Sequence, residues 1–211
     1  MRLSSKRPIL DIEYLVYDVF KKHYPVDLES VKRNPMRCFF AATDVHKERL
    51  TFLSPETEDC YLIFSACLAV PGCYSKTIKV NGAEYVDGGT VNPLPAKALL
   101  ERGADTILAI LSRPLDCESE PPSWLERTLF WRYFQKYDWM LEKLWEAAEA
   151  YKEEVLRLER LSAMKPPRAL IISPKKMPPA AFITRDRGKI NRTIDQGYRT
   201  VQEREKEIRN F

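Results

Sequence analysis

One stretch of the sequence decides the fold: Tyr85-Val86-Asp87-Gly88-Gly89-Thr90-Val91-Asn92-Pro93-Leu94-Pro95. It predicts a short strand that ends at Asp87, a turn made by the two glycines, and a helix that Asn92 caps and Pro93 begins. This helix should end near Gly103, because glycine favours the residue just past a helix. A continuous apolar strand follows at 106–111. Strand, helix and buried strand form a crossover unit, so we expect the two strands to be parallel.

In this arrangement Asp87 lies at the carboxyl end of its strand, the edge at which open α/β sheets bind their ligands. Its carboxylate is a candidate catalytic base, and Gly88 and Gly89 would allow another segment or a substrate to come close. Asp-Gly is also a common turn dipeptide, so Asp87 could instead bond only the backbone of its own turn. These residues alone leave both interpretations open.

Several other pieces of sequence accompany this turn in a fixed order. The first, Phe39-Phe40-Ala41-Ala42-Thr43-Asp44, predicts a strand that ends in Ala-Thr-Asp, and the later ones are 63–74, 80–89, 92–95 and 103–105. Together they resemble the carboxyl-terminal part of a patatin-like phospholipase domain, closely over residues 8–114 and more loosely from there to Tyr198. Tyr151 and the stretch Asp195-Gln196-Gly197-Tyr198 look like a bacterial branch of that family.

This resemblance implies an α/β fold with a three-layer α/β/α arrangement and the hydrolysis of lipid acyl esters by a Ser-Asp dyad. It implies no histidine, metal or cofactor. Asp87 would be the base of the dyad, and Asp87-Gly88-Gly89 its motif. We expect residues 1–114 to form the carboxyl-terminal part of the domain, truncated on its amino-terminal side. Residues 115–211 would be a helical extension of the same domain, with a long helix, a last buried strand and a charged carboxyl-terminal helix.

The sequence departs from the family pattern upstream of these matches. In the family, the serine lies on a Gly-x-Ser-x-Gly elbow, and an earlier glycine-rich loop forms the oxyanion hole. This sequence has seven glycines and the first is Gly72, so residues 1–71 cannot supply either feature. We therefore expect a chain that supplies the base, lacks a nucleophile and is inactive alone. The alternatives are a non-catalytic binding or interaction protein, or one half of a split hydrolase whose partner chain carries the serine.

Other nucleophiles are weaker candidates. Ser65 lies in an apolar segment that predicts a buried helix, where a hydroxyl usually bonds the preceding turn. Cys67 and Cys73 have no histidine or cationic cluster beside them to lower the thiol pKa, and indicate buried thiols. The only histidines are His23 and His46, and His46 lies in a charged turn typical of the tip of a hairpin.

Composition narrows the function classes. The chain has 211 residues, 45% of them hydrophobic, and can bury a core as one domain. A net charge of +4 does not by itself indicate a nucleic-acid partner. No apolar run approaches the roughly 18 residues that span a membrane. The five cysteines form no Cys-x-x-Cys pair, so we expect reduced thiols and a cytoplasmic protein, with contact at a membrane surface left open.

A nucleotide-binding α/β module is a further alternative. It would need a glycine-rich phosphate loop between a strand and a helix. Gly88-Gly89 is the sole candidate, and the carboxylate of Asp87 beside it would repel a phosphate unless a metal intervened.

A long apolar pattern runs from Phe130 to Leu158 at spacings of four and three, and predicts a helix of about eight turns. One interpretation is a lipid-facing or lid helix, because Trp favours membrane interfaces and basic residues could meet anionic headgroups. The other is a helix packed on the sheet or on a partner, which its many glutamates favour. The side chains in question are Trp124, Trp131, Trp139 and Trp145, with Arg127, Arg132, Lys136 and Lys143.

A basic cluster in the last quarter of the chain is a second candidate anion site. It could contact phospholipid headgroups, or it could be a solvated loop with glutamates nearby. Its members are Lys175, Lys176, Arg185, Arg187, Lys189 and Arg192.

The remaining pattern predicts a chain of short elements. Asn81-Gly82 is a strong signal for a two-residue hairpin turn. We expect helices at 11–22, 57–68 and 191–209, and strands at 38–42, 50–53, 78–80, 83–86 and 170–172.

Overall fold

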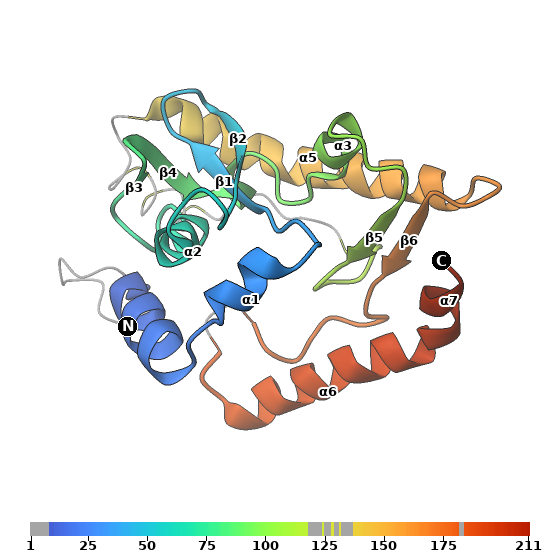
Figure 1. Cartoon of the computed structure of the whole chain (residues 1–211). Helices are drawn as coiled ribbons and strands as arrows, with labels where there is room; N and C mark the ends of the chain where they lie inside the picture. The colour runs from blue at the N-terminus through green and yellow to red at the C-terminus, as the bar shows by residue number, and fades with distance from the viewer. Residues whose placement is uncertain (1–8, 118–123, 125–127, 129–130, 132–136, 182–183) are drawn as a thin grey trace. The chain divides into compact units, whose positions relative to one another are not determined.

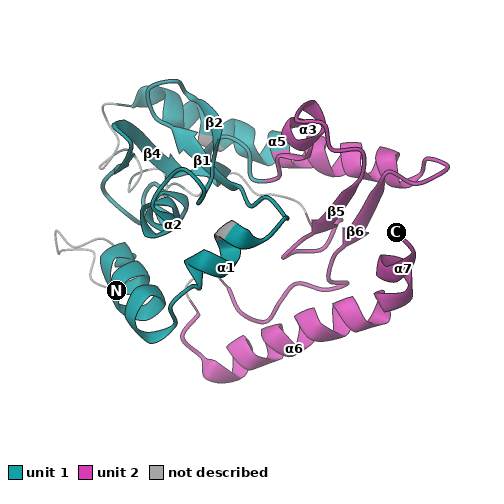
Figure 2. Cartoon of the chain, in the orientation of Figure 1, with its two compact units in different colours: residues 1–93, 120–150 teal, residues 94–119, 151–211 magenta. Residues whose placement is uncertain are grey.

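The computed structural model describes residues 9–117, 124, 128, 131, 137–181 and 184–211 (Figure 1). The chain divides into two compact units, residues 1–93 with 120–150 and residues 94–119 with 151–211 (Figure 2). Among the described residues, the first unit contains an antiparallel sheet and the second a parallel pair of strands, each accompanied by helices. The fold is therefore mixed α/β. The expected domain boundary at residue 114 stays a prediction.

The sheet of the first unit has the strand order β2-β1-β4-β3, and every neighbouring pair is antiparallel. Two hairpins build it. Asn81 and Gly82 both have positive φ, 49° and 83°, as a two-residue turn between β3 and β4 requires. Glu48, with φ 55°, lies in the turn between β1 and β2. Both predicted hairpins are confirmed, with the strands β1 (Phe40–Asp44), β2 (Arg49–Leu53), β3 (Ile78–Val80) and β4 (Ala83–Asp87).

Helix α2 (Cys60–Leu68) covers one side of this sheet. The carboxylate of Asp59 caps it by accepting from the N–H groups of Tyr61 and Leu62. Ile63 and Ala66 of α2 pack against buried side chains of β1, β2, β3 and β4. The predicted first helix appears as the π-helix η1 (Tyr14–His23), and a short helix α1 (Leu28–Arg33) follows it.

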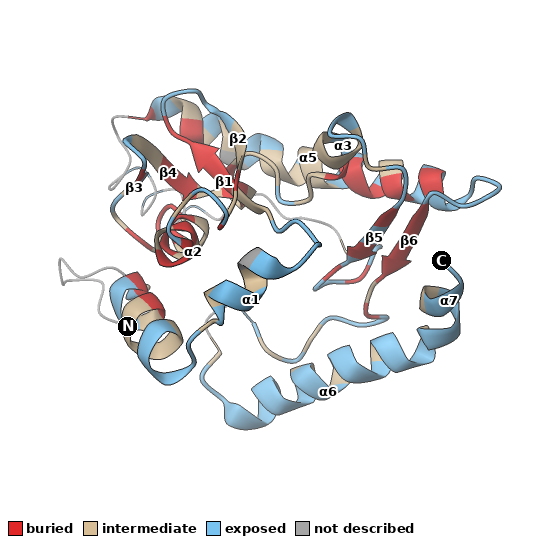
Figure 3. Cartoon of the chain, in the orientation of Figure 1, coloured by how far each residue is buried: buried red, intermediate tan, exposed pale blue. Residues whose placement is uncertain are grey.

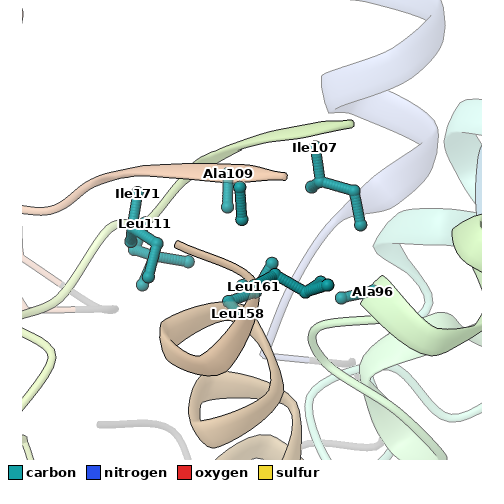
Figure 4. Close-up of a cluster of buried hydrophobic side chains, with 8 residues drawn as sticks. Ala96, Ile107, Ala109, Leu111, Leu158, Leu161 and Ile171 are labelled. Atoms are coloured by element: carbon teal, nitrogen blue, oxygen red, sulfur yellow. The ribbon is translucent and has the colours of Figure 1, made fainter. Parts of the chain in front are cut away.

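The second unit is built on strands β5 (Ile107–Ile110) and β6 (Ala169–Ile172), which pair in parallel with Ile107 opposite Ala169. Figure 4 shows Leu158 and Leu161 pointing toward the apolar side chains of these strands, among them Ala109 and Ile171. The last buried strand predicted from the sequence is confirmed. The helices of the second unit are α3 (Ala96–Glu101), the carboxyl-terminal part of α5 (Asp138–Ser162), α6 (Arg187–Glu203) and α7 (Glu205–Asn210).

The predicted parallel pairing of β4 with β5 is wrong. A strand has two edges, and β4 uses both in antiparallel ladders, with β1 on one side and β3 on the other. The Asn81-Gly82 turn brings β3 onto β4, so no edge is left for β5. Strand β5 pairs instead with β6, which follows it by about sixty residues.

The predicted helix start at Asn92 and Pro93 is also wrong. After Asp87 the chain makes a 3₁₀ turn, η2 (Gly88–Thr90), and α3 begins only at Ala96. A side chain from elsewhere satisfies its first turn: the carboxylate of Glu154, buried in α5, accepts from the N–H of Lys97 at 3.0 Å. The predicted end of the helix is confirmed, because Gly103 has φ 92° just past Glu101.

The long helix is confirmed as α5 from Asp138 onward. Its expected start at Phe130 lies outside the described residues, as do Phe134, Arg127, Arg132 and Lys136. In the described part it packs on β4 and on the residue that follows β1, because Met140 is buried with Val86 and Val45. The exposed tryptophans are Trp124, Trp131 and Trp145.

The carboxyl-terminal helix predicted for 191–209 is present as two helices that meet at Arg204. It begins earlier than expected because the carboxylate of Asp186 caps α6 through the N–H of Lys189. Figure 3 shows α6 exposed along most of its length. Among the helices that the structure describes, none combines the length and apolar character needed to cross a membrane.

The core of the second unit makes a prediction about α5. Leu158 is 0% exposed beneath β5 and β6, whereas Leu156 on the same helix is 44% exposed. Leu158→Ala should lower the free energy of unfolding by about 2–5 kcal/mol, because it leaves a cavity. Leu156→Ala is the matched control and should change it by less than about 0.5 kcal/mol. Urea unfolding followed by far-UV circular dichroism measures both, and equal effects would contradict this packing.

Candidate functional site

Asp87 is the last residue of β4, and its main chain is held from two directions. Its N–H donates to the carbonyl oxygen of Ala69 at 3.1 Å, just past the end of α2. Its carbonyl oxygen accepts from the hydroxyl of Thr43, a buried residue of β1, at 2.9 Å. In the β1–β4 ladder Asp87 lies opposite Ala42. The partly buried carboxylate therefore leaves the sheet from a fixed backbone.

The two glycines after Asp87 differ in the space around them. A Cβ on Gly88 would lie 2.5 Å from the carbonyl oxygen and 2.8 Å from the carbonyl carbon of Ala41, both atoms of the β1 backbone. A Cβ on Gly89 would lie 2.9 Å from Oδ2 of Asp87. The first glycine thus allows the turn to pack on fixed backbone of β1, whereas the Asp87 carboxylate could turn away from a Cβ on Gly89.

Burial dominates the electrostatics of this site. It raises the pKa of Asp87 above its ordinary value of 3.8, because the charged form loses hydration. The backbone N–H groups of Gly89 and Gly88 lower the pKa and offset part of this effect. Asp87 is the N-cap residue of η2, and its side chain makes no capping hydrogen bond to that turn. Bonding to its own turn therefore explains only part of the surroundings of Asp87. The net effect is still a raised pKa of its carboxyl group.

Among the candidate nucleophiles, Cys67 of α2 is the one whose pKa is affected by the charge of Asp87. Burial, and then the negative charge of Asp87, raise the pKa of its thiol to about 12. The thiol donates to the carbonyl oxygen of Ala41 at 3.3 Å. A thiol with this pKa is protonated at neutral pH and serves as a donor, so Cys67 is a poor nucleophile.

The other candidate catalytic residues differ in burial and in their partners. Ser65 is buried in α2, and its hydroxyl donates to the carbonyl oxygen of Tyr61 at 2.9 Å, as the sequence predicted. His46 is exposed at the hairpin tip, with Nε2 4.0 Å from a carboxylate oxygen of Glu84. His23 ends η1 and is exposed, and Cys73 lies partly buried after α2. In the part of the chain that the structure describes, no three His, Cys, Asp or Glu side chains cluster as metal ligands would.

Tyr151, quoted above for the bacterial branch, lies in α5 with its hydroxyl buried and without a hydrogen-bond partner among the described residues. Burial raises the pKa of this hydroxyl. The guanidinium of Arg113 lies 5.5 Å from the ring centroid. Asp195, Gln196 and Tyr198 lie on α6, so the second unit holds both pieces of that resemblance.

No family model matches the chain. One curated relative is the uncharacterized protein YjjU of Escherichia coli strain K12, which is 22% identical over 126 residues, or 58% of this chain. The match covers 35% of the relative, so this chain spans about a third of the length of the protein it resembles.

The members of the basic cluster predicted from the sequence have different surroundings in the structure, and only some of them line a common groove. Lys175 forms an ion pair with Glu203 at 2.7 Å, and Lys189 lies in the first turn of α6. Lys175, Lys176 and Arg192 line a groove together with Arg199 and Arg204, which the sequence reasoning missed. A signal for Arg199 was present, because it follows Arg192 by seven residues and therefore shares its helix face.

The close approach of the turn to β1 makes a prediction about Gly88. Gly88→Ala should lower the free energy of unfolding by about 1–3 kcal/mol or more, because the added Cβ meets backbone that cannot move aside. Gly197→Ala, in the middle of α6 with nothing within 4 Å, should instead raise it by roughly 0.5–1 kcal/mol. Thermal and urea unfolding of the two variants give the comparison. A neutral Gly88→Ala would show that the turn does not pack as described.

The raised pKa of Asp87 makes a prediction about pH. Between pH 3.8 and the higher folded-state pKa, the folded state binds more protons than the unfolded state, so stability falls as pH rises through this window. Asp87→Asn removes this loss. The stability of the variant relative to the wild type should therefore increase from pH 3 upward and level off above the folded-state pKa.

Urea unfolding followed by tryptophan fluorescence suits this measurement, because all four tryptophans lie in the first unit. Asp27→Asn is the control of opposite sign. Hydrogen bonds from Ser30 lower the pKa of Asp27, so its carboxylate stabilises the fold once ionised, and the variant should lose relative stability as pH rises. A relative stability of Asp87→Asn that does not change with pH would contradict the raised pKa.

Proposed function

We propose that Asp87 is the general base of a patatin-like lipid acyl hydrolase, and that the serine nucleophile lies outside these 211 residues. One observation carries the proposal: a partly buried carboxylate with a raised pKa stands at the end of a strand, before two glycines, the first of which the packing requires. The resemblance of residues 8–114 to the family supplies the chemistry. The three-layer α/β/α arrangement of the complete domain and its cytoplasmic location belong to the same proposal.

The reaction would use Asp87 twice. As a serine hydroxyl attacks the ester carbonyl, the carboxylate accepts its proton, and the proton then passes to the departing alcohol. Water, activated in the same way, releases the acid from the acyl-enzyme. A base works best when its pKa is closer to the working pH than that of a solvated aspartate, and burial moves Asp87 in this direction. No metal or cofactor enters this scheme.

The fixed backbone of Asp87 supports this role. Its N–H and C=O are both bonded, to Ala69 and Thr43, so the carboxylate does not have to order itself when a substrate arrives. The candidate nucleophiles of this chain do not compete for the role of serine. The Ser65 hydroxyl is bonded within α2, and the Cys67 thiol is protonated at neutral pH.

A second candidate function is that of a non-catalytic interaction protein, and one observation favours it. Strand β5 alternates buried and exposed side chains, and its exposed positions are the apolar residues Leu108 and Ile110, which are 45% and 69% exposed. Apolar side chains adjacent on one face of a strand are typical of a surface that a partner covers. A partner chain that carries the serine would use such a surface too.

The test starts from the DNA immediately upstream of the Met1 codon, translated in every frame. The proposal predicts a glycine-rich loop and a Gly-x-Ser-x-Gly elbow there. Expressed with this chain, that segment should give stoichiometric labelling by a fluorophosphonate and hydrolysis of a p-nitrophenyl acyl ester. Asp87→Asn should then lower kcat by roughly 10²–10⁴-fold with little change in KM, because a general base is lost.

Asp59→Asn is the control, since asparagine also caps a helix and this residue lies in the same unit. It should leave kcat within about twofold of the wild type. The 211-residue chain alone should not be labelled. Labelling of this chain alone, or full activity of Asp87→Asn, would refute the assignment of Asp87. If no such segment is encoded, the interaction function becomes the better account.

A further inference from the structure

A groove with a volume of about 790 Å³ lies in the second unit, between α6 and the segment that follows β6. Its volume falls in the range of small-molecule sites. Five cationic side chains line it, Lys175, Lys176, Arg192, Arg199 and Arg204. Two carboxylates, Asp195 and Glu203, also line it, which leaves a net charge of +3. No role for this groove follows from Asp87, which belongs to the other unit.

Hydrogen bonds join the two walls of the groove. The side-chain amide of Gln196, on α6, donates to the carbonyl oxygen of Lys176 at 2.6 Å. The hydroxyl of Thr193, one turn earlier, accepts from the N–H of Ala180 at 2.9 Å. The segment after β6 is therefore tied to α6 at two points, and the cationic side chains start from a backbone that is already in place.

The positive charge of the groove is only partly compensated. Lys175 pairs with Glu203, and the guanidinium of Arg204 bonds Glu207 and the carbonyl oxygen of Ile171. The Nε of Arg204 is buried and has no hydrogen-bond partner among the described residues. A buried guanidinium nitrogen without a partner is costly, and an acceptor bound in the groove would relieve this cost.

The remaining cations show no ion pair within the described residues. They are Lys176, Arg192 and Arg199, and the two arginines lie seven positions apart on one face of α6. Arginine presents a planar fork of donors that matches the oxygens of a phosphate, and an ammonium adds a mobile point charge. The lining thus has the composition of a site for a phosphate-bearing anion.

We propose that this groove binds a phosphate group, carried either by an anionic phospholipid or by a soluble phosphate compound. Another face of α6 bears on the choice between these two sources. Ile190, Ile194, Tyr198 and Val201 follow one another at helical spacing and are exposed, Tyr198 to 69%. An exposed apolar stripe on a basic helix is typical of a helix that lies on a lipid surface, so vesicles belong in the test.

The test measures binding to two probes at pH 7 and low salt. The first is inorganic pyrophosphate, followed by calorimetry. The second is vesicles of phosphatidylcholine with phosphatidic acid, followed by co-sedimentation, with pure phosphatidylcholine vesicles as the blank. The wild type should bind at least one anionic probe, and binding should weaken as salt is added.

Two double variants remove the same charge. Arg192→Gln with Arg199→Gln empties the groove of two unpaired cations and should weaken binding by about tenfold or more. Lys206→Gln with Arg209→Gln acts on α7, outside the groove, and should change it by less than about twofold. Circular dichroism and thermal unfolding show whether each variant is folded. A variant that fails to fold is replaced by the single change Arg199→Gln, paired with Arg209→Gln.

The outcomes separate clearly. Binding of pyrophosphate that depends on the groove supports a site for soluble phosphates, and groove-dependent binding of vesicles alone supports a lipid headgroup. Absence of binding to both probes, or equal loss in the two double variants, overturns the proposal. Asp87→Asn should bind the probes as the wild type does. Phosphate binding by the groove and catalysis by Asp87 are therefore tested separately, and the failure of one proposal leaves the other standing.

Discussion

The pairing of β1 with β4 is the interaction on which the first unit depends. It places Ala42 opposite Asp87 and brings the Ala41 carbonyl so close to Gly88 that no side chain fits between them. The same carbonyl accepts from the thiol of Cys67, which fixes α2 against the sheet at this point. Sheet, turn and helix thus meet around one peptide group, and the carboxylate of Asp87 projects from that junction.

Local signals in the sequence predicted the elements of the fold well. Asn81-Gly82 gave the hairpin because only a few residue types accept positive φ at both positions of such a turn. Gly103 marked the end of α3 for a similar reason. The pairing of strands depends on which edges remain available, and no local pattern records this. The β3–β4 hairpin occupies an edge of β4, and a crossover rule applied to β4 and β5 alone could not take that into account.

The candidate site was predictable to a similar degree. Asp87, Gly88 and Gly89 stand out in the sequence, and the structure adds the reason for Gly88, which lies against the backbone of Ala41. The role of Ala41 in crowding the turn could not be predicted, because an alanine in a strand carries no signal of a close backbone approach. In the cationic groove, Lys175, Lys176 and Arg192 were visible as a cluster. Arg204 was missed because it reaches the groove only through the break between α6 and α7.

The bond from the N–H of Lys97 to Glu154 has a consequence for the order in which the chain folds. A helix of six residues, such as α3, is too short to persist alone in water, and the carboxylate that completes its first turn is 57 positions away. Strands β5 and β6 are separated by a similar length of chain. The second unit must therefore close a long loop before it gains most of its native contacts, whereas the hairpins of the first unit join neighbours in sequence. During synthesis on the ribosome, α3 therefore cannot form its stabilising bond to Glu154 until α5 has been synthesised.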